Sequence, residues 1–204
     1  MHVKTIPVGQ LQTNCYVVTD PETKRAAVID PGDEAPLILA YLEEHGLTPE
    51  AVFLTHGHYD HTMAADDIVQ AYHIPVYISE QDLSADNQPT PYRYTPSTEP
   101  RVWSDGDTVQ VGNLTFHILA TPGHSPGSVC IRVEDCLFTG DTLFRDDCGR
   151  TDLPGGNSQT MLATLARIHQ LEGDMEVYPG HMDASSLDRE RRFNYYLRQA
   201  ASKK

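Results

Sequence analysis

The stretch "THGHYDHT", residues 55–62, places three histidines and one aspartate within six consecutive positions. It follows "AVFL" at 51–54, a short apolar run that is typical of a buried strand. Gly57 has no side chain, which lets the backbone bend so that His56 and His58 converge. Imidazole groups brought together in this way at the end of a strand indicate a metal site.

The other polar residues of this stretch, Asp60 and His61, fall on the following turn, and we expect them to point toward a second ion. Polar residues follow three further apolar runs in the same manner. "FHILATPG" leads into His124, "CLFTG" into Asp141 and "MEVYPG" into His181, with Gly or Pro at each turn. Strand ends commonly deliver polar groups to one crevice, so these side chains are expected to meet.

Together the candidate ligands are five imidazoles and two carboxylates, which suit zinc, manganese or iron. A carboxylate can bridge two ions through its two oxygens, and Asp141 is expected to be this shared ligand. Seven ligands then divide into three, three and one bridge, which leaves coordination positions for water, as in a catalytic site. We predict two divalent ions, with Zn²⁺ first and Fe or Mn as alternatives. The predicted ligands are His56, His58, Asp60, His61, His124, Asp141 and His181.

The composition is that of an ordinary globular protein. With 204 residues, 39% of them hydrophobic and 22% charged, the chain fits a single domain over 1–204. Its 15 basic and 29 acidic residues give a formal charge of −14, which argues against nucleic acid and membrane partners and favours a small-molecule substrate. We recognise no signal peptide, transmembrane segment or CxxC pair, and therefore expect reduced cysteines in a cytoplasmic protein. A single disulfide in a secreted protein is the alternative.

Hydrophobic periodicity predicts strands and helices in two similar halves. Strand-like runs precede an amphipathic helix over 34–46, and another helix is expected over 61–73. Further strand-like runs between 107 and 142 lead to helices over 157–173 and 187–200. This order indicates mixed sheets covered by helices, an α+β layered sandwich in one domain.

Residues 87–100, "NQPTPYRYTPSTEP", contain four prolines and two tyrosines and are not expected to form regular structure. We predict a flap in which Tyr92 and Tyr94 cover the substrate. A surface loop without a role is the alternative. The oligomeric state stays open, because the final helix could pack inward or against a partner.

The motifs "TNCYVV", "IDPG", "HGHYDH", His124, Asp141 and "YPGH", in this order, resemble those of the metallo-β-lactamase superfamily over nearly the whole chain. The resemblance implies a four-layer αββα sandwich with a binuclear site at the sheet edge. It assigns one metal to His56, His58 and His124, and the other to Asp60, His61 and His181, with Asp141 between them.

Within the superfamily the chain is most similar to the short type II glyoxalases, or hydroxyacylglutathione hydrolases, in "FTGDTLF", "CGR" and "LPGG". This resemblance implies hydrolysis of a thioester, with Arg150 matching a basic position that contacts the glutathione tail. Two departures concern the thiol: "TDL" replaces aromatic positions after Arg150, and "PGHMDASS" replaces the usual continuation of "PGH".

The predicted reaction is attack of a metal-bridging hydroxide on an acyl carbonyl, with Asp60 and Asp141 as catalytic carboxylates. Asp30 in "IDPG" is a candidate acceptor that would orient a ligand imidazole, or else a turn residue. Arg150 is expected to bind a substrate carboxylate, or else is a solvated loop residue. The alternative functions are a persulfide dioxygenase with one iron, a lactone or β-lactam hydrolase, and a metal-stabilised binding module.

Overall fold

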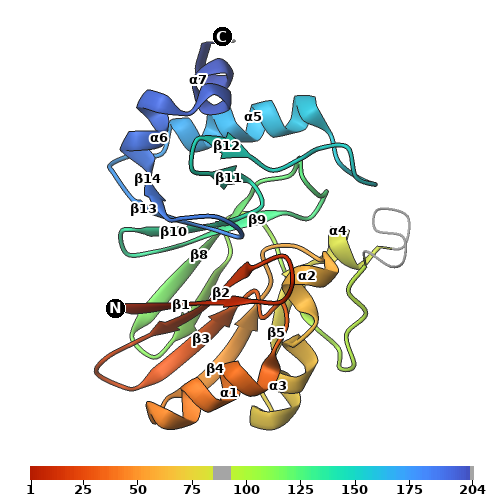
Figure 1. The fold of residues 1–204 in the computed structure, drawn as a ribbon, viewed down its shortest axis with the longest axis vertical. Helices are drawn as coiled ribbons and strands as arrows, with labels where there is room; N and C mark the ends of the chain where they lie inside the picture. Colours follow the sequence, from red (N-terminus) through yellow and green to blue (C-terminus); the bar gives the residue numbers. More distant parts are fainter. Residues whose placement is uncertain (85–92, 203–204) are drawn as a thin grey trace.

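Two six-stranded sheets lie face to face, with helices on both outer surfaces (Figure 1). The computed structural model describes residues 1–84 and 93–202. The first sheet contains, in sequence order, β1 (His2–Val8), β2 (Thr13–Thr19), β3 (Arg25–Ile29), β4 (Thr48–Phe53), β5 (Val76–Ser79) and β6 (Arg101–Trp103). The first three strands are antiparallel, whereas β3 to β6 run parallel. Parallel neighbours need crossovers, and α1 (Ala35–Glu44) and α3 (Ala65–Tyr72) supply the first two.

The second sheet has the strand order β14-β13-β10-β9-β8-β7. Its strands are β7 (Thr108–Val111), β8 (Leu114–Ala120), β9 (Val129–Val133), β10 (Cys136–Gly140), β13 (Glu176–Pro179) and β14 (Ser185–Ser186). Only β10 and β13 are parallel neighbours in this sheet as described, and α5 (Ser158–His169) connects them. A separate hairpin of β11 (Leu143–Phe144) and β12 (Asp147–Cys148) follows β10.

Three apolar clusters separate the four layers. Strand β2 is buried on both faces, as alternation of side chains along a strand requires for a central position. Cys15 and Val17 belong to the cluster beneath α1 and α3, whereas Tyr16 and Val18 belong to the cluster between the sheets. A third cluster packs α5 against the outer face of the second sheet. The predicted four-layer αββα sandwich is confirmed.

Main-chain hydrogen bonds join the two sheets near the ends of β4, β10 and β13. Val129 N donates to Thr55 O at 2.8 Å, just beyond β4. Asn14 N in β2 donates to Gly180 O at 2.7 Å, and Gly180 N donates within the second sheet to Gly140 O at 2.8 Å. The loops that leave these strands therefore meet at one edge of the sandwich.

The single helix predicted over 187–200 is wrong, because the structure has two helices there, α6 (Leu187–Phe193) and α7 (Tyr195–Ser202). Asn194 between them has an extended backbone, with φ −67° and ψ 118°. Its buried side chain accepts hydrogen bonds from two N–H groups in the first turn of α7, at 3.0 and 3.1 Å. The amide also donates to two carbonyl groups of the β11–β12 hairpin, at 3.1 and 2.9 Å. Capping and tertiary hydrogen bonds thus end a helical pattern that continues in the sequence.

The helix predicted over 61–73 is also divided, into α2 (Tyr59–Thr62) and α3. Ala64, at the boundary, donates its N–H to Pro31 O at 3.0 Å, which ties the junction to the loop after β3. Strand β6 was not predicted, because its three residues lie between the proline-rich loop and the next turn. Of the loop itself, residues 93–100 are described.

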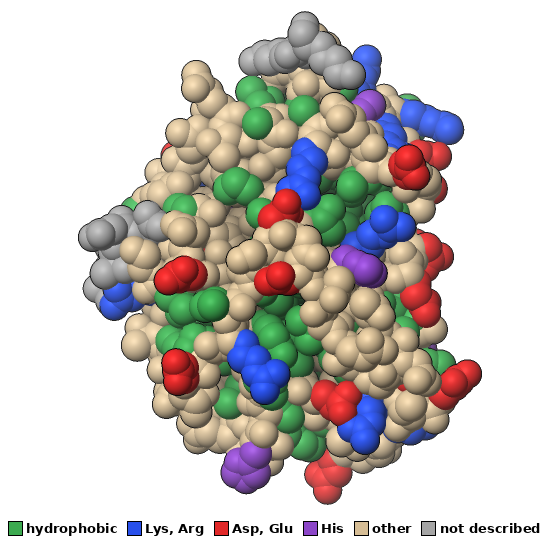
Figure 2. Space-filling view, turned by 180° about the vertical axis from the view of Figure 1, so that it is seen from behind, with side chains coloured by type: hydrophobic (Ala, Val, Ile, Leu, Met, Phe, Trp, Pro, Cys, Tyr) green, Lys and Arg blue, Asp and Glu red, His purple; other side chains and the backbone are tan. Residues whose placement is uncertain are grey.

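The surface carries basic and acidic side chains interspersed. Figure 2, which shows the face opposite to that of Figure 1, has Lys and Arg scattered among Asp and Glu. Across residues 1–84 and 93–202, no helix is long and apolar enough to span a bilayer. All four cysteines are free thiols.

Candidate metal centre

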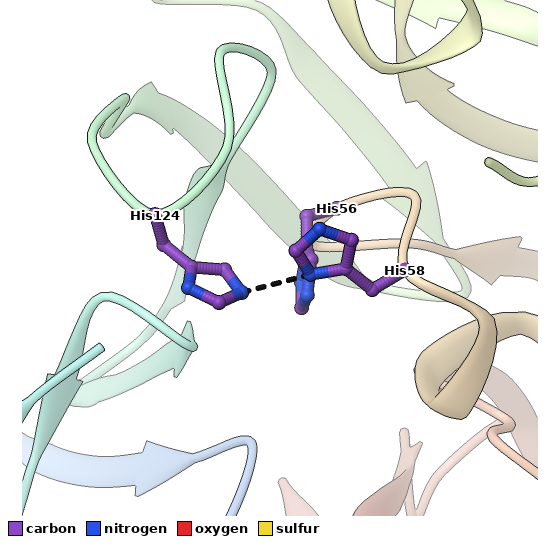
Figure 3. A group of neighbouring side chains, drawn as sticks. All are labelled: His56, His58 and His124. Atoms are coloured by element: carbon purple, nitrogen blue, oxygen red, sulfur yellow. Dashed lines mark hydrogen bonds between the residues drawn. The ribbon is translucent and has the colours of Figure 1, made fainter. Parts of the chain in front are cut away.

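Three buried histidines from two strand ends form the first part of the site. His56 and His58 follow β4, and His124 follows β8. Their rings lie close together at nearly right angles (Figure 3), and Nδ1 of His58 lies 2.9 Å from Nε2 of His124. One ring nitrogen of each lies within 4.8 Å of those of the other two. This three-histidine group has the donors and the spacing that one metal ion requires.

A second group contains Asp60 and His61 from α2 and His181 from the loop after β13. Nε2 of His181 lies 3.3 Å from Oδ2 of Asp60 and 3.3 Å from Nε2 of His61. These three ligand atoms also lie within 4.8 Å of one another. The turn of α2 therefore carries its two polar residues toward the end of β13, so that a site for a second ion forms beside the first.

Asp141 lies between the two groups. Its Oδ2 is 3.5 Å from Nε2 of His124 in the first group, and its Oδ1 is 3.4 Å from Nε2 of His61 in the second. Nε2 of His181 lies 3.6 Å from Oδ2. Gly180 allows this approach, since a Cβ at that position would lie 2.3 Å from Oδ1 of Asp141. A carboxylate in contact with both groups is placed to be a ligand that two ions share.

Neighbouring acceptors fix the orientation of the rings. Oδ2 of Asp30 lies 3.0 Å from Nδ1 of His61, and Asp30 also accepts hydrogen bonds from N and Oγ1 of Thr55, at 2.7 and 2.6 Å. Nδ1 of His124 lies 2.8 Å from the carbonyl oxygen of Arg150. A partner at Nδ1 leaves Nε2 for the metal and sets the plane of the ring. Asp30 also falls in a group with His56 and His61, but its hydrogen bonds place it as the orienting acceptor.

Electrostatics divide the histidines into two classes. Burial and neighbouring imidazoles lower the pKa of His56 well below its usual value and that of His58 to about 4, so both rings are neutral. Burial has the same effect on His61, but the carboxylates of Asp141 and Asp30 outweigh it and raise the pKa well above the usual value. Burial would raise the pKa of Asp141, yet His61 and two further histidines lower it. Neutral imidazoles and ionised carboxylates are the forms that bind a cation, so His56, His58 and Asp141 are already in the binding form, whereas His61 has to release a proton when an ion binds.

A buried donor atom without a hydrogen-bond partner also indicates a bound metal. Nε2 of His56 is buried, and it has no hydrogen-bond partner among the residues that the structure describes. Such an atom costs about 1–3 kcal/mol in a folded protein, and a bound cation would remove that cost. Five nitrogen and two oxygen donors without a thiolate match the preferences of zinc, iron and manganese.

The centre opens into a cavity of about 640 Å³, large enough for a small organic substrate. His58, Asp60, His124, Asp141 and His181 lie in its wall. Sequence reasoning missed the apolar part of the wall, to which Leu11, Phe144, Leu153 and Met182 contribute. Proximity to a motif was the available signal for two of them, because Phe144 ends "GDTLF" and Met182 directly follows His181.

Of the residues predicted to bind substrate, Arg150 lies at the cavity and Tyr94 does not. Arg150 lies in the cavity wall, and its exposed guanidinium donates two hydrogen bonds to Asp152, at 2.7 and 2.9 Å. The prediction that Tyr94 covers the substrate is wrong. Its side chain is buried in the cluster beneath α3, its hydroxyl donates to Asp66, and it does not line the cavity. Tyr92 lies outside the described residues. Cys148 lines the cavity but belongs to neither ligand group.

Known proteins are similar to this chain in sequence and in fold. The family model described as "Metallo-beta-lactamase superfamily" matches residues 8–181. Hydroxyacylglutathione hydrolase GloC of Haemophilus influenzae is 31% identical over 209 residues, which cover 97% of this chain and 98% of that protein.

Two solved structures are similar over nearly their whole length. The crystal structure of the BLEG-1 B3 metallo-beta-lactamase has a TM-score of 0.88 and 34% identity, and the match covers 96% of this chain and 99% of that one. The crystal structure of TTHA1623 in a di-iron-bound form has a TM-score of 0.83 and 35% identity, with 95% and 100% covered. This chain belongs to the metallo-beta-lactamase superfamily and is a metal-dependent hydrolase of that family.

Proposed function

We propose that the protein hydrolyses thioesters, with a hydroxyacylglutathione as the first candidate substrate, at a centre of two divalent ions. The observation that carries the proposal is the position of Asp141, which is 3.5 Å from a ligand atom of one group and 3.4 Å from a ligand atom of the other. The similarity to GloC supports the choice of a thioester.

The ions would be held by the three-histidine group, by Asp60, His61 and His181, and by Asp141 from both sides. When bound, such ions lower the pKa of a coordinated water toward about 7 and polarise a carbonyl group. Asp60 faces the cavity, and its pKa is lowered, because its hydrogen bond to His181 and the charge of His61 outweigh burial. It is therefore an ionised acceptor that can hold a water molecule at the cavity wall. The leaving thiolate is a stable anion, so the reaction requires no strong general acid.

The cavity wall suits a substrate that is partly apolar. Leu11, Phe144 and Met182 would contact the acyl group or the thiol arm, whereas Arg150 would bind a carboxylate. Because the guanidinium of Arg150 already binds Asp152, a substrate carboxylate has to replace or share that partner. We therefore expect Arg150 to adjust specificity for the thiol and to have a small effect on the chemical step.

β-Lactam hydrolysis is the second candidate, because the BLEG-1 enzyme matches over 96% of the chain. A persulfide dioxygenase with one iron would not need the Asp60, His61 and His181 group, which is complete here. Metal content and oxygen uptake separate that alternative from a hydrolase.

The test is a panel of thioesters, lactones and β-lactams, with kcat/KM measured for protein reconstituted with Zn²⁺, Fe²⁺ or Mn²⁺. We expect a thioester to give the highest value. Asp141→Asn should lower kcat/KM by more than the roughly 10–100-fold that is typical of residues acting through a ligand. Asp147→Asn is the matched control, since Asp147 lines the same cavity, but its carboxylate accepts a hydrogen bond from Cys148 N and is not proposed as a metal ligand. Preference for a β-lactam, or equal effects of the two variants, would contradict the proposal.

A further inference from the structure

Asp82 is a fully buried carboxylate that none of the metal-ligand motifs contains. It lies on the short helix α4 (Glu80–Leu83), which directly follows β5, and its relative exposure is 0%. Its Oδ2 accepts hydrogen bonds from Gly57 N at 2.9 Å and from Oγ of Ser125 at 2.7 Å. Its Oδ1 accepts one from Gly127 N at 2.7 Å. A buried charge is costly unless it is hydrogen-bonded in this way, so the three donors need an explanation beyond filling space.

The donors belong to the two loops that carry the three-histidine group. Gly57 lies between His56 and His58, and Ser125 directly follows His124. Asp82 therefore links these loops through the residues that are adjacent to all three histidines. One side chain thus ties the loop after β4 to the loop after β8.

Gly127 is needed for this contact, and Gly57 leaves space for it. A Cβ on Gly127 would lie 2.6 Å from the carboxyl carbon of Asp82, and a Cβ on Gly57 would lie 3.0 Å from its main-chain oxygen. Real Cβ atoms do not approach other atoms at the shorter distance. The glycine of "HGH" thus makes room for Asp82 as well as letting the backbone bend.

We infer that Asp82 is a positioning residue that sets the affinity of the three-histidine group for its ion, an inference that rests on the proposed two-ion site. The second group is oriented by a different contact, the hydrogen bond between Asp30 and His61. Loss of Asp82 should therefore weaken one ion much more than the other. A purely structural carboxylate would instead weaken both ions in proportion to the loss of fold stability.

Asp82→Asn is the informative variant, because asparagine has the same shape and cannot replace the carboxylate. If its oxygen accepts from Gly57 and Ser125, its NH₂ group faces the N–H of Gly127. If the amide is turned, the NH₂ group faces the N–H of Gly57. Either orientation sets two donors against each other and moves one loop. Ser125→Ala is the milder second variant, since it removes the hydrogen bond from one hydroxyl and leaves those from Gly57 and Gly127.

The test measures Co²⁺ affinity by visible absorption in two backgrounds. The His181→Ala variant removes a ligand of the second group, so its Co²⁺ affinity reports on the three-histidine group. The His124→Ala variant removes a ligand of the three-histidine group, so its Co²⁺ affinity reports on the second group. We expect Asp82→Asn to weaken Co²⁺ binding about 10–100-fold in the His181→Ala background. In the His124→Ala background the change should be much smaller, because the groups that donate to Asp82 are those of Gly57, Ser125 and Gly127 and not those of Asp60, His61 or His181. Ser125→Ala should follow the same pattern with a smaller effect.

Asp20→Asn is the matched control, because buried Asp20 also accepts hydrogen bonds from main-chain N–H groups and a hydroxyl, those of Glu22, Asn113 and Thr23, and none of these residues belongs to a ligand group. It should lower the thermal unfolding midpoint without changing either affinity. Equal weakening by Asp82→Asn in both backgrounds, or no weakening in either, would overturn the inference. If wild-type protein binds two ions but cleaves no thioester, the proposed substrate is wrong and the inference about Asp82 stands. If wild-type protein binds no ion at these residues, both are wrong.

Discussion

Replacement of Asp30 by asparagine should change the tautomer of His61. Once His61 has released the proton that its raised pKa favours, Asp30 accepts a hydrogen bond from Nδ1–H of His61 at 3.0 Å, which leaves the Nε2 lone pair directed at the ligand group. Its other oxygen accepts from Thr55 N at 2.7 Å. Asparagine tolerates the positive φ of 49° at this position and can keep the hydrogen bond to Thr55. Its NH₂ group then replaces the oxygen beside His61, so that Nδ1 has to accept and the proton moves to Nε2.

The magnitude follows from the hydrogen bond that is lost. A hydrogen bond to a charged group contributes about 1.5–3 kcal/mol, which corresponds to roughly 10–150-fold in the affinity of the ion bound through His61. This range overlaps the roughly 10–100-fold that is typical when an orienting partner of a ligand is removed. Stability of the metal-free protein should change much less than affinity, because asparagine fills the same space and still binds Thr55.

Two measurements check this prediction. Chelator competition gives the affinity of each ion, and ¹⁵N chemical shifts of the imidazole show which nitrogen of His61 carries the proton. Asp67→Asn, on the exposed face of α3, is the control for loss of one negative charge. An affinity within about twofold of wild type, or a proton that stays on Nδ1 in Asp30→Asn, would refute the reasoning.

Three further predictions concern pH, backbone space and substrate charge. With chelator present, the free energy of unfolding should fall by about 3 kcal/mol as the pH is lowered from 6.5 to about 4. Burial and nearby imidazoles lower the pKa of His58 to about 4 in the folded protein. In this pH range the unfolded chain therefore binds a proton at His58 that the folded protein does not, which favours unfolding. Denaturant titrations across this range test it, and a flat profile contradicts it. Gly149→Ala should weaken metal binding at least about tenfold, because its Cβ would lie 1.8 Å from the carbonyl oxygen of Asp141. Gly173→Ala, with no atom within 4 Å, should reduce stability alone, and equal metal affinities in the two variants would contradict this prediction. Arg150→Ala should raise KM about threefold to tenfold for thioesters whose thiol carries a carboxylate, with kcat nearly constant. A fall in kcat for neutral and anionic thioesters alike would show that Arg150 does not act by binding a substrate carboxylate.

Local patterns predicted mixed sheets covered by helices and indicated the candidate ligands, whereas the four-layer αββα sandwich was implied by the resemblance to the superfamily. Strand β2 and the helices over the first sheet follow from hydrophobic periodicity, because burial of a strand or a helix face needs that spacing. The ligand candidates follow from imidazoles and carboxylates placed directly after apolar runs. The structure brings these residues together, including Asp141, which lies 80 positions beyond His61 in the chain.

Features set by tertiary contacts could not be predicted in the same way. The helical pattern continues through Asn194, and only its hydrogen bonds to the β11–β12 hairpin show that a helix ends there. Tyr94 lies on a proline-rich loop that suggested a flap, but the direction of a loop side chain depends on what it packs against. Here it packs beneath α3. No sequence pattern pointed to Asp82, because its role depends on hydrogen-bond donors from loops that are distant from it in the chain.

The central claim is that seven side chains hold two ions and that Asp141 contacts both. Anomalous diffraction from crystals grown with Zn²⁺, measured at the zinc absorption edge, tests this claim most directly. We predict two peaks, one within bonding distance of His56, His58 and His124 and the other within bonding distance of Asp60, His61 and His181, with an oxygen of Asp141 bonded to each. A single peak, or peaks away from these side chains, would contradict the account.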